Sequence, residues 1–140
     1  MKHTRAVAER YIKKHEGEVL KPYKDSRGIL TIGVGHNLEQ GISAEASDFI
    51  FKQDMDKAEA LLNANCPVFS QLDANRQLVL LDLCFNLGIN GLLGFRKMLA
   101  ALAVKNYNQA ARELMDSRYA KQVPNRAKEN RDVLLTGNLK

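Results

Sequence analysis

The chain has 140 residues, of which 45% are hydrophobic and 26% are charged, with a formal net charge of +5. This composition supports one folded domain with a buried core and excludes a disordered chain. No run approaches the ~18 apolar residues of a membrane-spanning helix, and the charged N-terminus lacks the apolar segment of a signal peptide. We therefore expect no stable membrane insertion, and the positive charge favours an anionic partner.

The first sixteen residues predict an amphipathic helix. Thr4 is a suitable N-cap residue, because its hydroxyl can accept a hydrogen bond from a free N–H of the first turn. Val7 and Tyr11 are spaced as an i, i+4 pair and predict a buried apolar stripe. The pattern stops at Glu16-Gly17, where glycine is a common helix terminator. A carboxylate is therefore expected at the C-terminal end of this helix.

The next segment predicts a small sheet. Residues 19–23 are expected to form an edge strand, because Pro22 cannot donate a ladder hydrogen bond. Residues 25–28, Asp-Ser-Arg-Gly, have the composition of a tight turn. Residues 30–35 alternate apolar with small residues and predict a second strand.

The rest of the chain predicts helices. Ser43 precedes a helix that runs to about residue 63, and Pro67 interrupts the chain before a second long helix over residues 72–87. This second helix is apolar on nearly every side, as expected for the centre of a domain. Glycines 88, 91 and 94 predict a tight turn. Further helices are expected at about 92–104, 108–115 and 125–135. A small sheet followed by helices predicts an α+β fold.

Three residues near the predicted sheet carry polar groups suited to one reaction. Glu16, Asp25 and Thr31 lie at a helix end, in a turn and on a strand, so they can meet around one concavity. Two carboxyl groups in different environments are the minimal equipment for glycoside hydrolysis, one protonated as the acid and one ionised. The alternatives are an exposed helix-end Glu, a turn-forming Asp and a Thr chosen for strand propensity.

The whole pattern is more specific than these three residues. It resembles the active-site signature of the phage-type lysozymes, the muramidase family of the T-even phage enzyme, and similar blocks occur in order over nearly the whole chain. The matching blocks are Glu16-Gly17, Tyr23-Lys24-Asp25, Gly28, Thr31-Ile32-Gly33-Val34-Gly35-His36, Phe85-Asn86-Leu87-Gly88, Gly91-Leu92-Leu93-Gly94-Phe95, Ser117-Arg118-Tyr119, Gln122-Val123-Pro124-Asn125-Arg126-Ala127 and Thr136-Gly137.

The resemblance implies one lysozyme-like catalytic domain over residues 1–140. Its small N-terminal lobe, with a β-hairpin sheet, would comprise about residues 15–55. Its helical lobe would comprise about residues 1–14 and 66–140, and a long helix over about 43–63 would link the two. The sugar cleft is expected between the lobes.

The resemblance also implies the catalytic roles. Glu16 is the expected general acid, and its position at a helix end predicts partial desolvation, which raises a carboxyl pKa. Asp25 is the expected base. Thr31 is expected to help hold the attacking water from a stiff strand.

Five further residues are expected around the catalytic groups. Gly35 lets glycan approach the sheet, although turn geometry explains it nearly as well, and Phe85 lines the cleft or belongs to the core. The resemblance implies that Arg126 pairs with the catalytic glutamate and that His36 pairs with Asp54. These last three residues are expected to support the site.

The implied function is that of an endolysin, a muramidase that cuts the β-1,4 bond between N-acetylmuramic acid and N-acetylglucosamine in bacterial peptidoglycan, with inversion. We expect a monomer without metal or cofactor, made in the host cytoplasm and acting on the periplasmic wall, with holin-dependent release. Cys66 and Cys84 are expected to be free thiols. Nucleic-acid binding is the competing class, but no aromatic-basic interleaving supports it. A lysozyme relative that only binds glycan is the other alternative, as are tail-associated or injected lysozymes.

Overall fold

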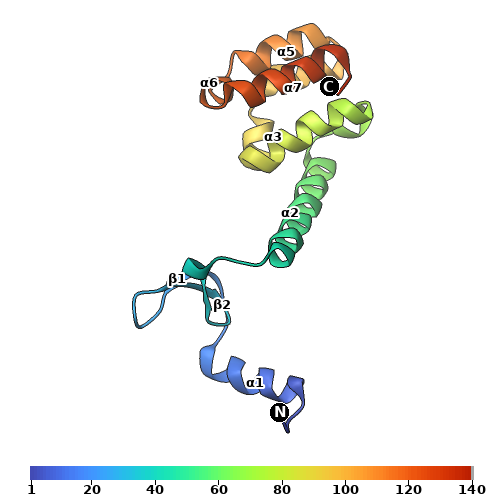
Figure 1. Cartoon of the computed structure of the whole chain (residues 1–140). Helices are drawn as coiled ribbons and strands as arrows, with labels where there is room; N and C mark the ends of the chain where they lie inside the picture. The colour runs from blue at the N-terminus through green and yellow to red at the C-terminus, as the bar shows by residue number, and fades with distance from the viewer. Residues whose placement is uncertain (140) are drawn as a thin grey trace. The chain divides into compact units, whose positions relative to one another are not determined.

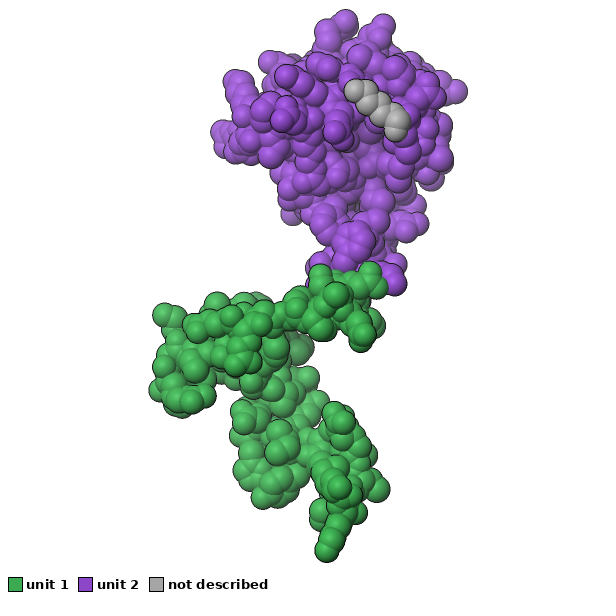
Figure 2. All heavy atoms as spheres, in the orientation of Figure 1, with its two compact units in different colours: residues 1–49 green, residues 50–140 purple. Residues whose placement is uncertain are grey.

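The computed structural model describes residues 1–139 and confirms the α+β fold (Figure 1). Contacts divide the chain into two compact units, unit 1 (Met1–Phe49) and unit 2 (Ile50–Lys140), coloured green and purple in Figure 2. The boundary falls within α2. The elements are α1 (Arg5–Glu16), β1 (Val19–Lys24), β2 (Leu30–Gly33), β3 (His36–Asn37), η1 (Leu38–Gln40), α2 (Ala44–Asn65), η2 (Phe69–Gln71), α3 (Ala74–Leu93), α4 (Arg96–Ala103), α5 (Tyr107–Met115), α6 (Arg118–Gln122) and α7 (Pro124–Thr136).

Helix α1 begins and ends where its sequence predicts. The Thr4 side chain accepts a hydrogen bond from the N–H of Val7. At the other end the N–H of Gly17 donates to the carbonyl of Lys13, and Gly17 has a φ of 73°. A residue with a side chain adopts this left-handed region at a cost, so glycine ends the helix directly after Glu16.

The sheet of unit 1 is antiparallel with the order β1-β2-β3. Strand β1 is an edge strand, as Pro22 predicts, and its pairing with β2 is irregular between Val19 and Tyr23. The predicted strand over residues 30–35 was too long, because β2 ends at Gly33 and the chain turns back into β3. Gly33 and Gly35 both have positive φ, and this turn conformation interrupts the strand.

The apolar stripe predicted on α1 is not covered by the rest of unit 1. No residue of α1 is buried, and the side chains of Tyr11 and Ile12 are 64% and 55% exposed. Among residues 1–49 the only buried residue is Thr31. Unit 1 therefore has a sheet but little core of its own.

The hydrophobic core lies in unit 2 and is built around α3, as its apolar sequence predicts. Within the described chain its fully buried side chains include Leu80 and Leu83 of α3, Leu114 of α5 and Leu134 of α7. Helices α5 and α7 pack against each other, and α4 packs on α5 (Figure 1). Asp73 caps α3 through its side chain, which accepts from the N–H of Arg76.

The turn predicted at the three glycines is reduced to one break. Gly88 has a φ of 77° and kinks α3, whereas the helix continues from there to Leu93. Helix α4 consequently starts later than predicted, at Arg96, and the short helix α6 was not predicted. Among residues 1–139 no single helix is long and apolar enough to span a membrane, and only the pair α3 and α4, bent by 97°, passes that test together.

Candidate active site

Glu16 lies against the turn that joins β2 to β3. A Cβ atom placed on Gly35 would stand 2.7 Å from Oε2 of Glu16 and 3.1 Å from its Cδ. Glycine at this position therefore leaves the space that the carboxylate occupies. The end of α1 and the glycine turn of the sheet are thus adjacent, which places Gly35 beside the predicted acid.

Glu16 is exposed in the described structure, so the partial desolvation predicted from its helix-end position is not provided within unit 1. The neighbouring charges on the chain are partly paired with each other. Nζ of Lys13, one helical turn before Gly17, lies 3.3 Å from Oε1 of Glu18. The predicted role of Glu16 as general acid stays a prediction.

Asp25 is held by the turn that it opens. Its Oδ1 accepts hydrogen bonds from the N–H groups of Arg27 at 2.8 Å and Ile29 at 2.9 Å. The bond from Ile29 is the main reason that the pKa of Asp25 lies below its ordinary value. Desolvation opposes this lowering of the pKa, and the N–H and the positive charge of Arg27 add smaller contributions that lower it further. The turn therefore favours an ionised Asp25, as a catalytic base requires.

Thr31 lies on β2 opposite Tyr23 of β1 and is 4% exposed. Its hydroxyl donates a 2.8 Å hydrogen bond to the carbonyl of Ile29. The hydroxyl proton is therefore already engaged, and Oγ1 is left with acceptor lone pairs. Thr31 can thus accept a hydrogen bond from a water molecule but does not have its proton to offer.

His36 follows the glycine turn in unit 1. One of its ring nitrogens, Nε2, lies 2.8 Å from the carbonyl oxygen of Gly41. This contact links the start of β3 to the residue after η1. Asp54, its predicted partner, belongs to unit 2, and the pairing of these two side chains stays a prediction.

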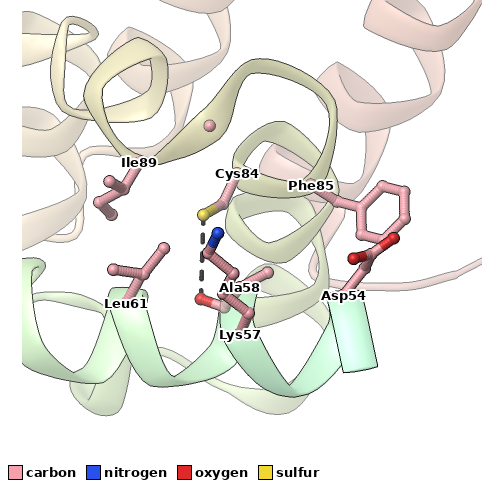
Figure 3. Close-up of a pocket in the computed structure, with 8 residues that line it drawn as sticks. Asp54, Lys57, Ala58, Leu61, Cys84, Phe85 and Ile89 are labelled. Atoms are coloured by element: carbon pink, nitrogen blue, oxygen red, sulfur yellow. Dashed lines mark hydrogen bonds between the residues drawn. The ribbon is translucent and has the colours of Figure 1, made fainter. Parts of the chain in front are cut away.

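Asp54 and Phe85 line one pocket of unit 2, with a volume of about 240 Å³ (Figure 3). Asp54 comes from α2 and Phe85 from α3, and the Phe85 ring lies beside the Asp54 carboxylate in that view. Phe85 is 41% exposed, so it forms part of the pocket wall and not of the buried core. Its ring makes an edge-on contact with the ring of Phe51. The remaining lining residues are Lys57, Ala58, Leu61, Cys84, Gly88 and Ile89.

Arg126 is paired with a residue that the sequence analysis did not single out. Its guanidinium donates two hydrogen bonds to the Asp82 carboxylate, at 2.9 and 2.6 Å. Asn130 donates to the same carboxylate and to the hydroxyl oxygen of Tyr119. Burial raises the pKa of Asp82, but the hydrogen bonds from Arg126 and Asn130 outweigh it, so this pKa is lowered. The predicted pairing of Arg126 with the catalytic glutamate stays a prediction.

The sequence does contain a signal for Asp82. It is a single acidic residue inside the apolar run Leu80-Leu81-Asp82-Leu83-Cys84. A charge within an apolar run of a helix at the domain core is expected to have a partner, because burying an unpaired charge is costly. The signal does not reveal which of the later basic residues is the partner.

Cys66 and Cys84 are buried free thiols, and burial raises the pKa of each. The sulfur of Cys84 lies 3.8 Å from the carbonyl oxygen of Ala58, the contact drawn in Figure 3. Within residues 1–139 no group of three or more His, Cys, Asp or Glu side chains could hold a metal ion.

The small antiparallel sheet followed by helices is consistent with the α+β fold of a lysozyme, and comparison with known proteins agrees. The phage lysozyme family matches residues 13–131. The chain belongs to this family and is a lysozyme-type glycoside hydrolase.

Three relatives illustrate the range of the family. Probable T4-type lysozyme 1 of Dictyostelium discoideum is 28% identical over 91% of this chain and 93% of its own length. The endolysin of Salmonella phage P22 is 38% identical over 71% of this chain and 73% of its own. The pre-baseplate central spike protein Gp5 of Enterobacteria phage T4 is 25% identical over 91% of this chain but only 27% of its own length.

Proposed function

We propose that this protein is an endolysin-type N-acetylmuramidase that hydrolyses the β-1,4 bond between N-acetylmuramic acid and N-acetylglucosamine of peptidoglycan. The observation that carries this proposal is the turn before β2, in which the main chain of Ile29 is hydrogen-bonded to both Asp25 and Thr31. The position of Glu16 beside Gly35, in the turn between β2 and β3, adds the second carboxyl group. The names of the endolysin and T4-type lysozyme relatives support the substrate class.

The proposed mechanism inverts the anomeric carbon. Glu16 donates its proton to the leaving glycosidic oxygen while water attacks from the opposite face of the sugar ring. Asp25 accepts one proton of this water, and Oγ1 of Thr31 accepts a hydrogen bond from the other, so an oxygen lone pair faces the anomeric carbon. Inversion requires room for this water, with carboxyl groups ~6.5–9.5 Å apart.

The proposed partner is the glycan strand of the wall. Gly35 and Phe85 are proposed to contact glycan, with His36, Asp54 and Arg126 supporting the site. We propose a monomer, made in the host cytoplasm and released to the periplasmic wall through a holin. The relationship to Gp5 keeps delivery on a phage tail as the competing route. Cell fractionation before and after holin expression distinguishes the two routes, because only holin-dependent release would move the protein from the host cytoplasm to the periplasm at that point.

The test is digestion of purified peptidoglycan by the wild-type chain and by Glu16→Gln and Asp25→Asn, with product NMR recorded before mutarotation. Loss of a general acid or base costs roughly 10²–10⁴-fold in rate, so both variants should be nearly inactive. Glu18→Gln is the matched control, because Glu18 is close in sequence and pairs with Lys13 instead.

A reducing N-acetylmuramic acid end with an initial α-anomer is the expected product. An initial β-anomer would show retention and recast Asp25 as a nucleophile or ion-pair stabiliser. Glu16→Gln with wild-type turnover would contradict the assignment of the acid. Binding of peptidoglycan without any cleavage by the wild-type chain would favour a binding protein, and salt-sensitive retention on DNA would favour the nucleic-acid alternative.

A further inference from the structure

The main chain of Ile29 is hydrogen-bonded to both groups that are proposed to hold the attacking water. Its N–H donates to Oδ1 of Asp25 at 2.9 Å. Its carbonyl accepts the N–H of Asp25 at 2.9 Å and the hydroxyl of Thr31 at 2.8 Å. One residue between the turn and β2 thus joins Asp25 and Thr31 through three bonds.

These bonds distinguish the two oxygens of the Asp25 carboxylate. Oδ1 accepts from the N–H groups of both Ile29 and Arg27, and within residues 1–139 Oδ2 accepts no hydrogen bond. The bonds also fix the direction in which the carboxylate points, since two N–H groups of a tight turn bind the same oxygen. Oδ2 is therefore the oxygen left to take a proton from water.

The third bond determines what Thr31 can offer. Because its proton is donated to the Ile29 carbonyl, Oγ1 is presented as an acceptor. A water between Oδ2 of Asp25 and Oγ1 of Thr31 would then meet two acceptors. Both of its hydrogens would be engaged, and its lone pair would be left for the sugar carbon.

We infer that the Ile29 main chain is a positioning element of the hydrolytic reaction, which selects Oδ2 of Asp25 as the basic oxygen and fixes Thr31 as a hydrogen-bond acceptor. This inference rests on the proposed function and adds a residue to it. The side chain of Ile29 takes no part in these three hydrogen bonds, so a side-chain substitution at Ile29 would leave them in place.

The test replaces the Ile29 amide by an ester, with isoleucine's side chain retained, in a semisynthetic full-length chain. The ester removes one N–H and leaves the carbonyl of Ile29 unchanged. The control is the same ester at Ser26, whose N–H donates to no protein group within the described chain. This ester weakens only the Asp25 carbonyl, which accepts the N–H of Gly28 at 2.9 Å, and leaves both N–H groups bound to Oδ1 of Asp25 in place. Both chains are followed by carboxyl ¹³C NMR titration of Asp25 and by the pH profile of kcat on a soluble muropeptide.

The Ile29 ester should raise the pKa of Asp25 toward its ordinary value, because its strongest stabilising hydrogen bond is lost. The acid limb of the kcat profile should move to higher pH by the same amount. At the pH optimum, kcat should fall roughly tenfold with KM nearly unchanged, the usual effect of losing one hydrogen bond to a charged group. The Ser26 ester should keep the wild-type pKa of Asp25 and the wild-type acid limb, because both hydrogen bonds to Oδ1 remain.

An Asp25 titration and acid limb that are the same in both ester chains would overturn the inference while leaving the muramidase assignment intact. A wild-type chain without hydrolytic activity would overturn the proposed function and this inference together. If the Ile29 ester does not fold, Thr31→Ser and Thr31→Val test the carbonyl side. Serine should restore most of the kcat that valine loses, and a valine variant with wild-type kcat would overturn the inference.

Discussion

Gly33 and Gly35 have nearly the same φ, 69° and 63°, but different surroundings. A Cβ on Gly33 would meet no atom within 4 Å, whereas a Cβ on Gly35 would meet the carboxylate of Glu16. Alanine variants at the two positions therefore separate two effects of an added Cβ: the conformational cost to the backbone, and the displacement of the Glu16 carboxylate.

We predict that Gly33→Ala and Gly35→Ala lower the free energy of unfolding by a similar amount, about 1–2 kcal/mol, because both force alanine into the left-handed region. The end of the Glu16 side chain can move away from a new Cβ, so the clash adds little to this cost. It displaces the acid, however, and only Gly35→Ala should lose most of its kcat. Urea unfolding and muropeptide turnover check both expectations, and equal kcat in the two variants would contradict them.

At the scale of elements, Arg76 joins the start of α3 to the end of α7. Its Nε donates to the carbonyl of Leu134 at 2.9 Å, and its guanidinium pairs with Asp73 at 3.1 Å. The same group stacks on the ring of Tyr107 at 3.4 Å, and Arg76 as a whole is only 9% exposed. The C-terminal end of unit 2 is thus held by one buried cation with polar and aromatic partners.

We predict that Arg76→Met lowers the free energy of unfolding by about 2–3 kcal/mol, because it leaves the buried Leu134 carbonyl without its charged donor. Arg131→Met is the matched control, since Arg131 pairs with Asp132 at a side-chain exposure of 35% and such pairs contribute ~0–1 kcal/mol. Denaturant unfolding of both variants gives the comparison. A cost for Arg76→Met no larger than that for Arg131→Met would show that α7 is held by its apolar packing alone.

At the scale of the whole molecule, the net charge of +5 acts on encounter rather than on the chemical step. Surface charges attract an anionic polymer over about one Debye length, which falls from ~10 Å at 0.1 M salt to ~3 Å at 1 M. The charge therefore matters most for a large anionic substrate.

We predict that lysis of permeabilised cells slows steeply between 0.05 and 0.5 M salt, conditions chosen to span this screening range. Turnover of a neutral chitooligosaccharide should change much less over the same range, because its encounter gains nothing from the protein's charge. If salt slowed lysis of cells and turnover of the chitooligosaccharide equally, salt would be acting on the folded enzyme and not on its attraction to the wall.

Local interactions explain why much of unit 1 was predictable. The Thr4 cap, the Gly17 terminator and the turn that begins at Asp25 each depend on bonds between residues at most four apart. The edge position of β1 follows from Pro22 alone. The predicted catalytic residues rest on the same local signature, and their roles stay predictions until the variants are measured.

By itself, the sequence determined the family, the α+β class and the extents of most elements, because residue types and short spacings encode them. Only the tertiary structure decided which later residues pair with Asp82 and Arg76, and that the apolar stripe of α1 is uncovered within unit 1. The partners of Asp82 and Arg76 lie 44 to 59 residues away along the chain. Many basic residues could pair with the carboxylate, and many carbonyl groups could accept from the guanidinium, so the sequence does not select among them. The bonds of Ile29 are local, but they use its main-chain N–H and carbonyl, which every residue but proline has, so the side chain of Ile29 gives no sign of them in the sequence.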